Sequence, residues 1–161
     1  MHPLARPSPI PGTTRVNQSL PDPDRHAEFY ADVPLKRGIA WLVDMLLIGL
    51  LTAVVVPFTG FLALLFIGGL FLVVNFLYRW VTLARGSATP GMRLVAIELR
   101  DVQGQDLGTT LAFAHTLGYS LSMAFVFPQL ISVALMLLSN RKQGLTDLVL
   151  GTVAINRAAR S

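Results

Sequence analysis

The chain has 161 residues, enough for one domain, and 53% of them are hydrophobic while only 14% are charged. Average soluble domains carry about 25% charged residues, so this balance indicates a protein in contact with lipid. The formal net charge is +4, but the basic residues flank apolar runs instead of forming a patch, which argues against nucleic-acid binding. The absence of cysteine excludes a disulfide framework, a thiolate metal site and a cysteine nucleophile.

Residues 1–34 contain seven of the ten prolines, together with Ser, Thr, Asp and Arg and almost no apolar periodicity. Such a composition cannot bury enough apolar surface to offset the entropy of ordering, so it predicts a disordered tail. A cleavable signal peptide is not expected, because the first apolar stretch begins only near Gly38. Residues 157–161 are expected to form a short C-terminal tail.

Residues 45–78 carry no charged side chain, and as one helix they would extend about 50 Å against a hydrocarbon core of about 30 Å. Pro57 and Gly60 interrupt the run, because proline removes a helical donor and glycine permits a reversal. We therefore predict an all-α membrane domain over residues 35–156 that begins with a helical hairpin. Its transmembrane spans cover about residues 37–56 and 61–81.

A polar region follows the second span, between residues 83 and 110. Within it Val95, Ile97 and Leu99 alternate with small or charged residues, a pattern typical of a half-buried strand. A second β-prone run covers residues 152–155. Neither short strand would be stable alone, so we expect the two to pair as a small β element at the cytoplasmic membrane surface.

A third hydrophobic segment, residues 111–139, is uncharged apart from His115 and contains Pro128. One long tilted span and a re-entrant hairpin both fit such a segment. Basic residues stand before the first span, after the second and after this segment, whereas the turn between the two spans has none. The positive-inside rule therefore places both termini and the central loop in the cytoplasm, and it favours a Pro128-broken segment that returns to the inner face.

Three segments carry a resemblance to a known family: residues 36–44 (KRGIAWLVD), 87–94 (SATPGMRL) and 141–153 (RKQGLTDLVLGTV). Together they resemble the RDD family of prokaryotic membrane proteins. The family is named for one arginine and two aspartates, which here match Arg37, Asp44 and Asp147. The resemblance covers about residues 35–155 and implies a multi-pass protein of the bacterial inner membrane. For some members it also implies a suspected transport role.

Asp44 lies about two turns into the first span, where a carboxylate costs on the order of 2.5–3.5 kcal/mol, so it needs a partner. The antiparallel second span brings Asn75 to a similar depth, and a third segment that enters from the inner face presents further polar side chains at helical spacing. We predict an intramembrane polar cluster of Asp44, Asn75, His115 and Tyr119, rimmed by Arg37, Arg93 and Asp147.

Two interpretations of these charges remain open. In the structural one, Arg37 pairs with Asp147 and fastens the C-terminal region to the first span, while Asp44 is satisfied by hydrogen bonds. In the functional one, Asp44 titrates or coordinates a cation on a transport pathway, with His115 as a relay.

The hypothesis for function is ion or solute transport, and two spans with part of a third require an oligomer to enclose a pathway. The alternative is an accessory or assembly subunit of a larger membrane complex. The expected partners are the lipid bilayer and other protein chains. No nucleophile motif, paired carboxylates or metal cluster is evident, so neither enzymatic activity nor a cofactor is expected.

Overall fold

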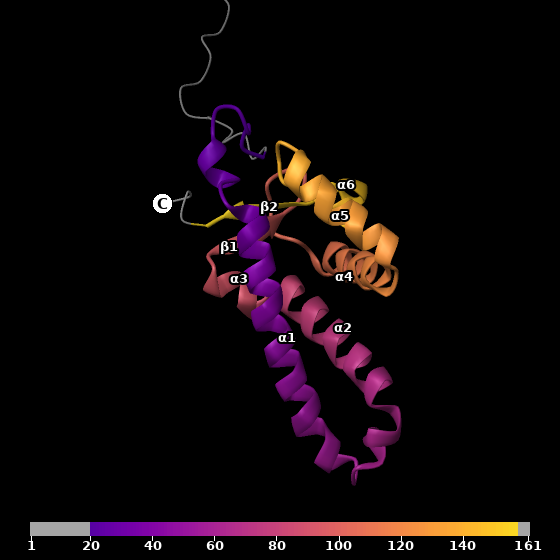
Figure 1. The fold of residues 1–161 in the computed structure, drawn as a ribbon. Coiled ribbons are helices and arrows are strands. Elements are labelled where there is room, and N and C mark those ends of the chain that lie inside the picture. Colours follow the sequence, from indigo (N-terminus) through magenta and orange to yellow (C-terminus); the bar gives the residue numbers. More distant parts are fainter. Residues whose placement is uncertain (1–19, 158–161) are drawn as a thin grey trace, which may run out of the picture.

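The computed structural model describes residues 20–157 (Figure 1). Its elements in chain order are η1 (Ala27–Phe29), α1 (Val33–Phe58), η2 (Leu62–Phe66), α2 (Ile67–Gly86), α3 (Pro90–Leu94), β1 (Ile97–Arg100), α4 (Thr109–Ala124), α5 (Val126–Leu138), α6 (Leu145–Leu150) and β2 (Val153–Asn156). The predicted fold class is confirmed: a helical hairpin, a bent third pair of helices and a small sheet.

The hairpin of α1 and α2 projects away from the other elements (Figure 1). Two helical stretches are long and apolar enough to cross a membrane, residues 27–58 and 62–86 among those described. The chain reverses after α1 at Gly60, whose φ of +60° suits glycine. The first predicted span lies inside α1, and the second lies inside η2 and α2 except for Phe61, which belongs to the turn.

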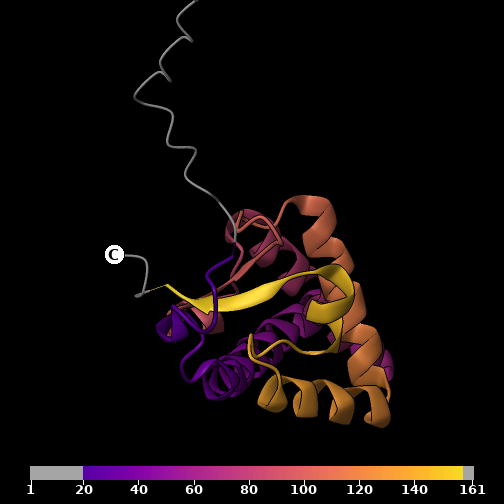
Figure 2. The ribbon, with the colours of Figure 1, turned by 90° about the horizontal axis from the view of Figure 1, so that it is seen from above.

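The bent pair consists of α4 and α5, whose axes differ by 116°. Figures 1 and 2 show both helices beside the hairpin at its sheet end. The predicted position of the break was wrong by a few residues, since α4 ends at Ala124 and the extended residue is Phe125. Pro128 explains the shift, because its ring excludes the carbonyl of the residue four positions earlier, which is Ala124. Pro128 itself lies in the first turn of α5, where it is tolerated.

The two strands pair in antiparallel register, with Ile97 opposite Asn156 and Arg100 opposite Val153. This confirms the predicted pairing, but the prediction of a half-buried strand was wrong, because all of β1 is buried. Glu98 and Arg100 are buried as an ion pair, with 2.5 Å between Arg100 Nη2 and Glu98 Oε1. Two charged side chains that pair with each other therefore occupy the strand positions that the alternating sequence pattern would place in solvent.

The apolar core lies where the sheet meets the hairpin. Ala40 of α1, Leu83 of α2, Met92 of α3, Ile97 of β1 and Ala112 of α4 are all buried there. The rest of the hairpin instead exposes large apolar side chains, as expected of helices that face lipid.

The disordered tail predicted for residues 1–34 was wrong for residues 20–34. The Tyr30 hydroxyl donates to the Pro21 carbonyl at 2.7 Å, and the buried side chains of Leu20 and Tyr30 pack with Val153 and Ile155 of β2. A few apolar residues suffice here because the sheet supplies the opposing surface. Residues 1–19 and 158–161 lie outside the described residues.

Candidate functional site

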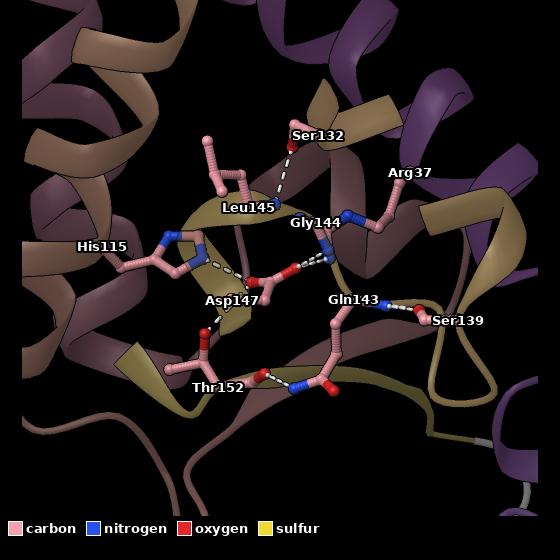
Figure 3. Close-up of polar contacts among 9 residues, drawn as sticks. All are labelled: Arg37, His115, Ser132, Ser139, Gln143, Gly144, Leu145, Asp147 and Thr152. Atoms are coloured by element: carbon pink, nitrogen blue, oxygen red, sulfur yellow. Dashed lines mark hydrogen bonds and ion pairs between the residues drawn. The ribbon is translucent and has the colours of Figure 1, made fainter. Parts of the chain in front are cut away.

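Asp147 is the centre of the first of two buried carboxylate sites, and none of its side chain is exposed. Its Oδ2 accepts hydrogen bonds from the Arg37 guanidinium and, at 2.9 Å, from the backbone N–H of Gly144 (Figure 3). Its Oδ1 lies 2.9 Å from Nε2 of His115 and accepts from the Thr152 hydroxyl at 3.1 Å. This carboxylate therefore joins α6 to α1 and α4.

The electrostatics of this site favour the ionised carboxylate. Burial alone raises the pKa of Asp147, but the Arg37 guanidinium and the hydrogen bond from His115 outweigh burial. The pKa of Asp147 is therefore held well below its usual range. The predicted Arg37–Asp147 pair is confirmed as a link between the C-terminal region and the first span.

Asp44 is the centre of the second site and is 1% exposed. Its Oδ1 accepts from the Tyr78 hydroxyl at 2.7 Å and from the backbone N–H of Gly91 at 2.9 Å. Its Oδ2 accepts from the Thr89 hydroxyl at 2.6 Å and lies 4.0 Å from Nη1 of Arg79. Three hydrogen-bond donors thus satisfy Asp44, and the carboxylate fixes α2 and α3 to α1.

The approach of α3 to α1 depends on glycine at position 91. A Cβ atom built on Gly91 would lie 2.2 Å from the carbonyl oxygen of Ala40 and 2.8 Å from Oδ1 of Asp44. The Thr89 hydroxyl begins α3 by accepting from the backbone N–H of Met92 at 3.2 Å while it donates to Asp44. These residues therefore form a short cap that holds the carboxylate from one side.

Arg79 lies beside Asp44 on the buried face of α2 and is 9% exposed. Its Nε donates to Oδ1 of Asn75 at 3.2 Å, and its Cζ lies 4.1 Å from the ring centroid of Tyr119. Within residues 20–157, the buried Nη2 of Arg79 has no hydrogen-bond partner. Two of the five N–H donors of this guanidinium, those on Nη2, are therefore unused.

A cavity of about 610 Å³ connects the two carboxylate sites. Its walls include Asp44, Arg79, His115, Tyr119 and Asp147, so charged groups from both sites reach the same space. Trp41 and Met136 are among the apolar residues that complete the wall. This volume is within the range of small-molecule sites, about 300–1,000 Å³.

The predicted polar cluster is thus divided between the two sites. Asn75 contacts Arg79 and not Asp44, His115 contacts Asp147, and the Tyr119 hydroxyl accepts from the Trp41 indole N–H at 2.8 Å. Asp44, His115 and Tyr119 still line one cavity, whereas Asn75 is not among the lining residues. Arg93 is exposed and is not among the lining residues.

The prediction missed three important residues: Arg79, Tyr78 and Thr89. Arg79 follows a long uncharged run, so the sequence alone groups it with the basic residues that flank the spans. Its spacing of four residues from both Asn75 and Leu83 is the signal that places it on one helical face, and all three are buried. The Thr-Pro pair at positions 89 and 90 is a typical helix start, which identifies Thr89 as a cap.

Comparison with known proteins matches residues 32–151 to the model of the RDD family. No curated protein and no solved structure matches the chain. The matched range includes Arg37, Asp44 and Asp147, and the two aspartates are the centres of the buried sites described above. With most of its length covered by the family model, the chain belongs to the RDD family of membrane proteins.

Proposed function

We propose that the protein takes part in moving a solute across the membrane and that the cavity between the hairpin and the α4–α5 pair is where the solute binds. The supporting observation is a cavity of about 610 Å³. Ionisable side chains line it, and several of them come from helices that are apolar enough to cross a membrane. Ionisable groups are costly at such positions and usually mark substrate or ion pathways.

The hydrogen bonding of the two carboxylates favours a solute other than a bare proton or metal cation. Asp44 and Asp147 each accept three or more hydrogen bonds, which a cation would have to displace. Both aspartates then hold the cavity walls in place. Among the described residues, no group of three or more His, Cys, Asp or Glu side chains is arranged to hold a metal ion.

Transport by this chain requires assembly, because two crossing helices cannot enclose a pathway. Gly49 and Ala53 form a small-residue face on α1, both exposed, and nothing lies within 4 Å of a Cβ built on Gly49. Small residues let another helix approach closely in a membrane. The same face fits the second candidate function, an accessory subunit that docks onto a different membrane protein.

The test is flux into proteoliposomes of protons, Na⁺, K⁺ and a medium-chain carboxylate, with wild-type protein and a variant whose cavity is filled. Met136→Trp enlarges a wall residue, whereas Leu138→Trp makes the comparable change on the exposed face of α5. We expect flux of the carboxylate and not of the three cations, lost with Met136→Trp and retained with Leu138→Trp. Absence of flux, with an unrelated membrane protein copurifying, would instead identify an accessory subunit.

A further inference from the structure

The cavity wall contains one cationic group whose hydrogen bonds are incompletely matched by the surrounding protein, and that group is Arg79, although Asp44 balances its charge as a long ion pair. Its Nη2 is buried without a partner in the described part of the chain, and its Nη1 is 4.0 Å from Asp44, beyond hydrogen-bond distance. The other cationic wall residue, Arg37, is already bound to Asp147. Arg79 is therefore the cationic wall residue with a hydrogen-bond donor that a ligand oxygen could satisfy.

The environment of Arg79 favours an anionic oxygen as that acceptor. The oxygens of Asp44 accept hydrogen bonds from Tyr78, Thr89 and the Gly91 amide. They therefore balance the charge of the guanidinium only from a longer distance and accept no hydrogen bond from it. Guanidinium groups bind carboxylate and phosphate oxygens through short, charge-assisted hydrogen bonds. The Tyr119 ring covers one face of the guanidinium, with its centroid 4.1 Å from Cζ.

The remaining wall favours a ligand with an apolar tail. Leu83, Met123 and Met136 line the cavity, and methionine side chains adapt to irregular apolar shapes. Leu35 and Leu137 line the cavity and are also exposed at the surface. The cavity thus opens beside apolar side chains, where a hydrocarbon chain gains from burial and a fully hydrated ion does not.

We propose that the cavity binds an amphipathic anion, a carboxylate or phosphate monoester with a hydrocarbon tail, whose acidic oxygen accepts from the guanidinium of Arg79. This inference rests on the proposed function of the cavity as the solute site and names the class of solute. Trp41 lines the same cavity, which provides an intrinsic reporter of occupancy. Trp80 is not among the lining residues, so Trp80→Phe leaves one reporter at the site.

The experiment measures quenching of Trp41 fluorescence in the full-length Trp80→Phe protein by 11-bromoundecanoate, with 11-bromoundecanol as a neutral probe of the same tail. We expect the acid to bind on the order of tenfold more tightly than the alcohol, since a charge-assisted hydrogen bond distinguishes them. Acetate and inorganic phosphate, which lack a tail, are expected not to displace the acid at equal concentration. Equal binding of acid and alcohol, or displacement by either small anion, would overturn the proposal.

A pair of variants assigns the preference to Arg79. Arg79→Gln is expected to remove the advantage of the acid, whereas Arg85→Gln, at an exposed position outside the cavity wall, is expected to preserve it. Preference that survives Arg79→Gln would contradict the assignment, and the comparison of the two probes in the Trp80→Phe protein leaves Arg79 unaltered. Binding of the acid without flux would retain this inference and remove the transport role. Flux without preference for the acid would retain the transport role and remove this inference.

Discussion

At the scale of single residues, Gly91 is the position where the addition of one methyl group is expected to lower stability the most. The carbonyl oxygen of Ala40, 2.2 Å from a Cβ at this position, belongs to the α1 backbone and cannot rotate away as a side chain does. We expect Gly91→Ala to lower the free energy of unfolding by about 1–3 kcal/mol, the usual cost of overpacking. Thermal unfolding in detergent, followed by tryptophan fluorescence, measures this loss.

Gly69→Ala is the matched control for this substitution. Gly69 lies in α2 with nothing within 4 Å of a built Cβ atom, so the added methyl group meets open space. Alanine also favours a helix more than glycine does, by about 1 kcal/mol. We therefore expect unchanged or slightly raised stability, and an equal loss in both variants would show that contact with α1 is not the cause.

How far the site was predictable also differs from residue to residue. The Arg37–Asp147 pair was among the predicted alternatives, because both residues carry the family resemblance. The partners of Asp44 were not predicted, since Thr89 and Gly91 lie more than 40 positions along the chain and meet it only once α3 has docked. Arg79 was missed because an arginine after an apolar run is indistinguishable from a flanking charge until the helix face is known.

At the scale of elements, α6 depends on the carboxylate of Asp147 for its attachment to α1 and α4. In Asp147→Asn the Arg37 guanidinium loses its charged partner, and breaking a buried pair costs about 3 kcal/mol or more. We expect the amides of α6 and β2 to exchange with solvent on the order of 100-fold faster, while those of α1 and α2 keep their protection. Hydrogen–deuterium exchange with mass spectrometry distinguishes local release from global destabilisation.

Asp106→Asn is the control, because it removes an aspartate that pairs with Arg100 but is 70% exposed. Such pairs contribute little, so exchange in the sheet should hardly change.

The lowered pKa of Asp147 adds a pH dependence: its stabilisation is fully present above the unfolded pKa of about 3.9 and is lost as the pH falls through the lower folded value. The difference between wild type and Asp147→Asn should therefore be constant near neutral pH and shrink only below about pH 4.

Elements that follow from local rules were predictable, and those that need a tertiary surface were not. The hairpin follows from the length of the uncharged run, and the strands follow from alternation and a nearby β-prone run. The short helix α3 was missed because Pro90 and Gly91 suggest a break, although Thr89 caps the helix and proline suits its first turn. The packing of residues 20–34 requires the completed sheet, which no local pattern indicates.

At the scale of the whole molecule, both ends of the described chain lie at the sheet end of the hairpin (Figure 1). Exposed positions that report on sidedness are Thr59 at the hairpin tip, Gln103 before α4 and Asn140 after α5. Because the chain has no cysteine, each can be replaced singly by cysteine without a background signal. An impermeant maleimide applied to intact cells then reports which positions face outward.

We expect Thr59→Cys to be labelled in intact cells, and Gln103→Cys and Asn140→Cys only after permeabilisation. The reason is that α4 and α5, bent by 116° and lying beside one end of the hairpin, return the chain to the side from which it entered. The basic residues Arg141 and Lys142 then stay on the cytoplasmic side, as the positive-inside rule requires. Labelling of Asn140→Cys together with Thr59→Cys, while Gln103→Cys stays protected, would show instead that the bent pair crosses the bilayer.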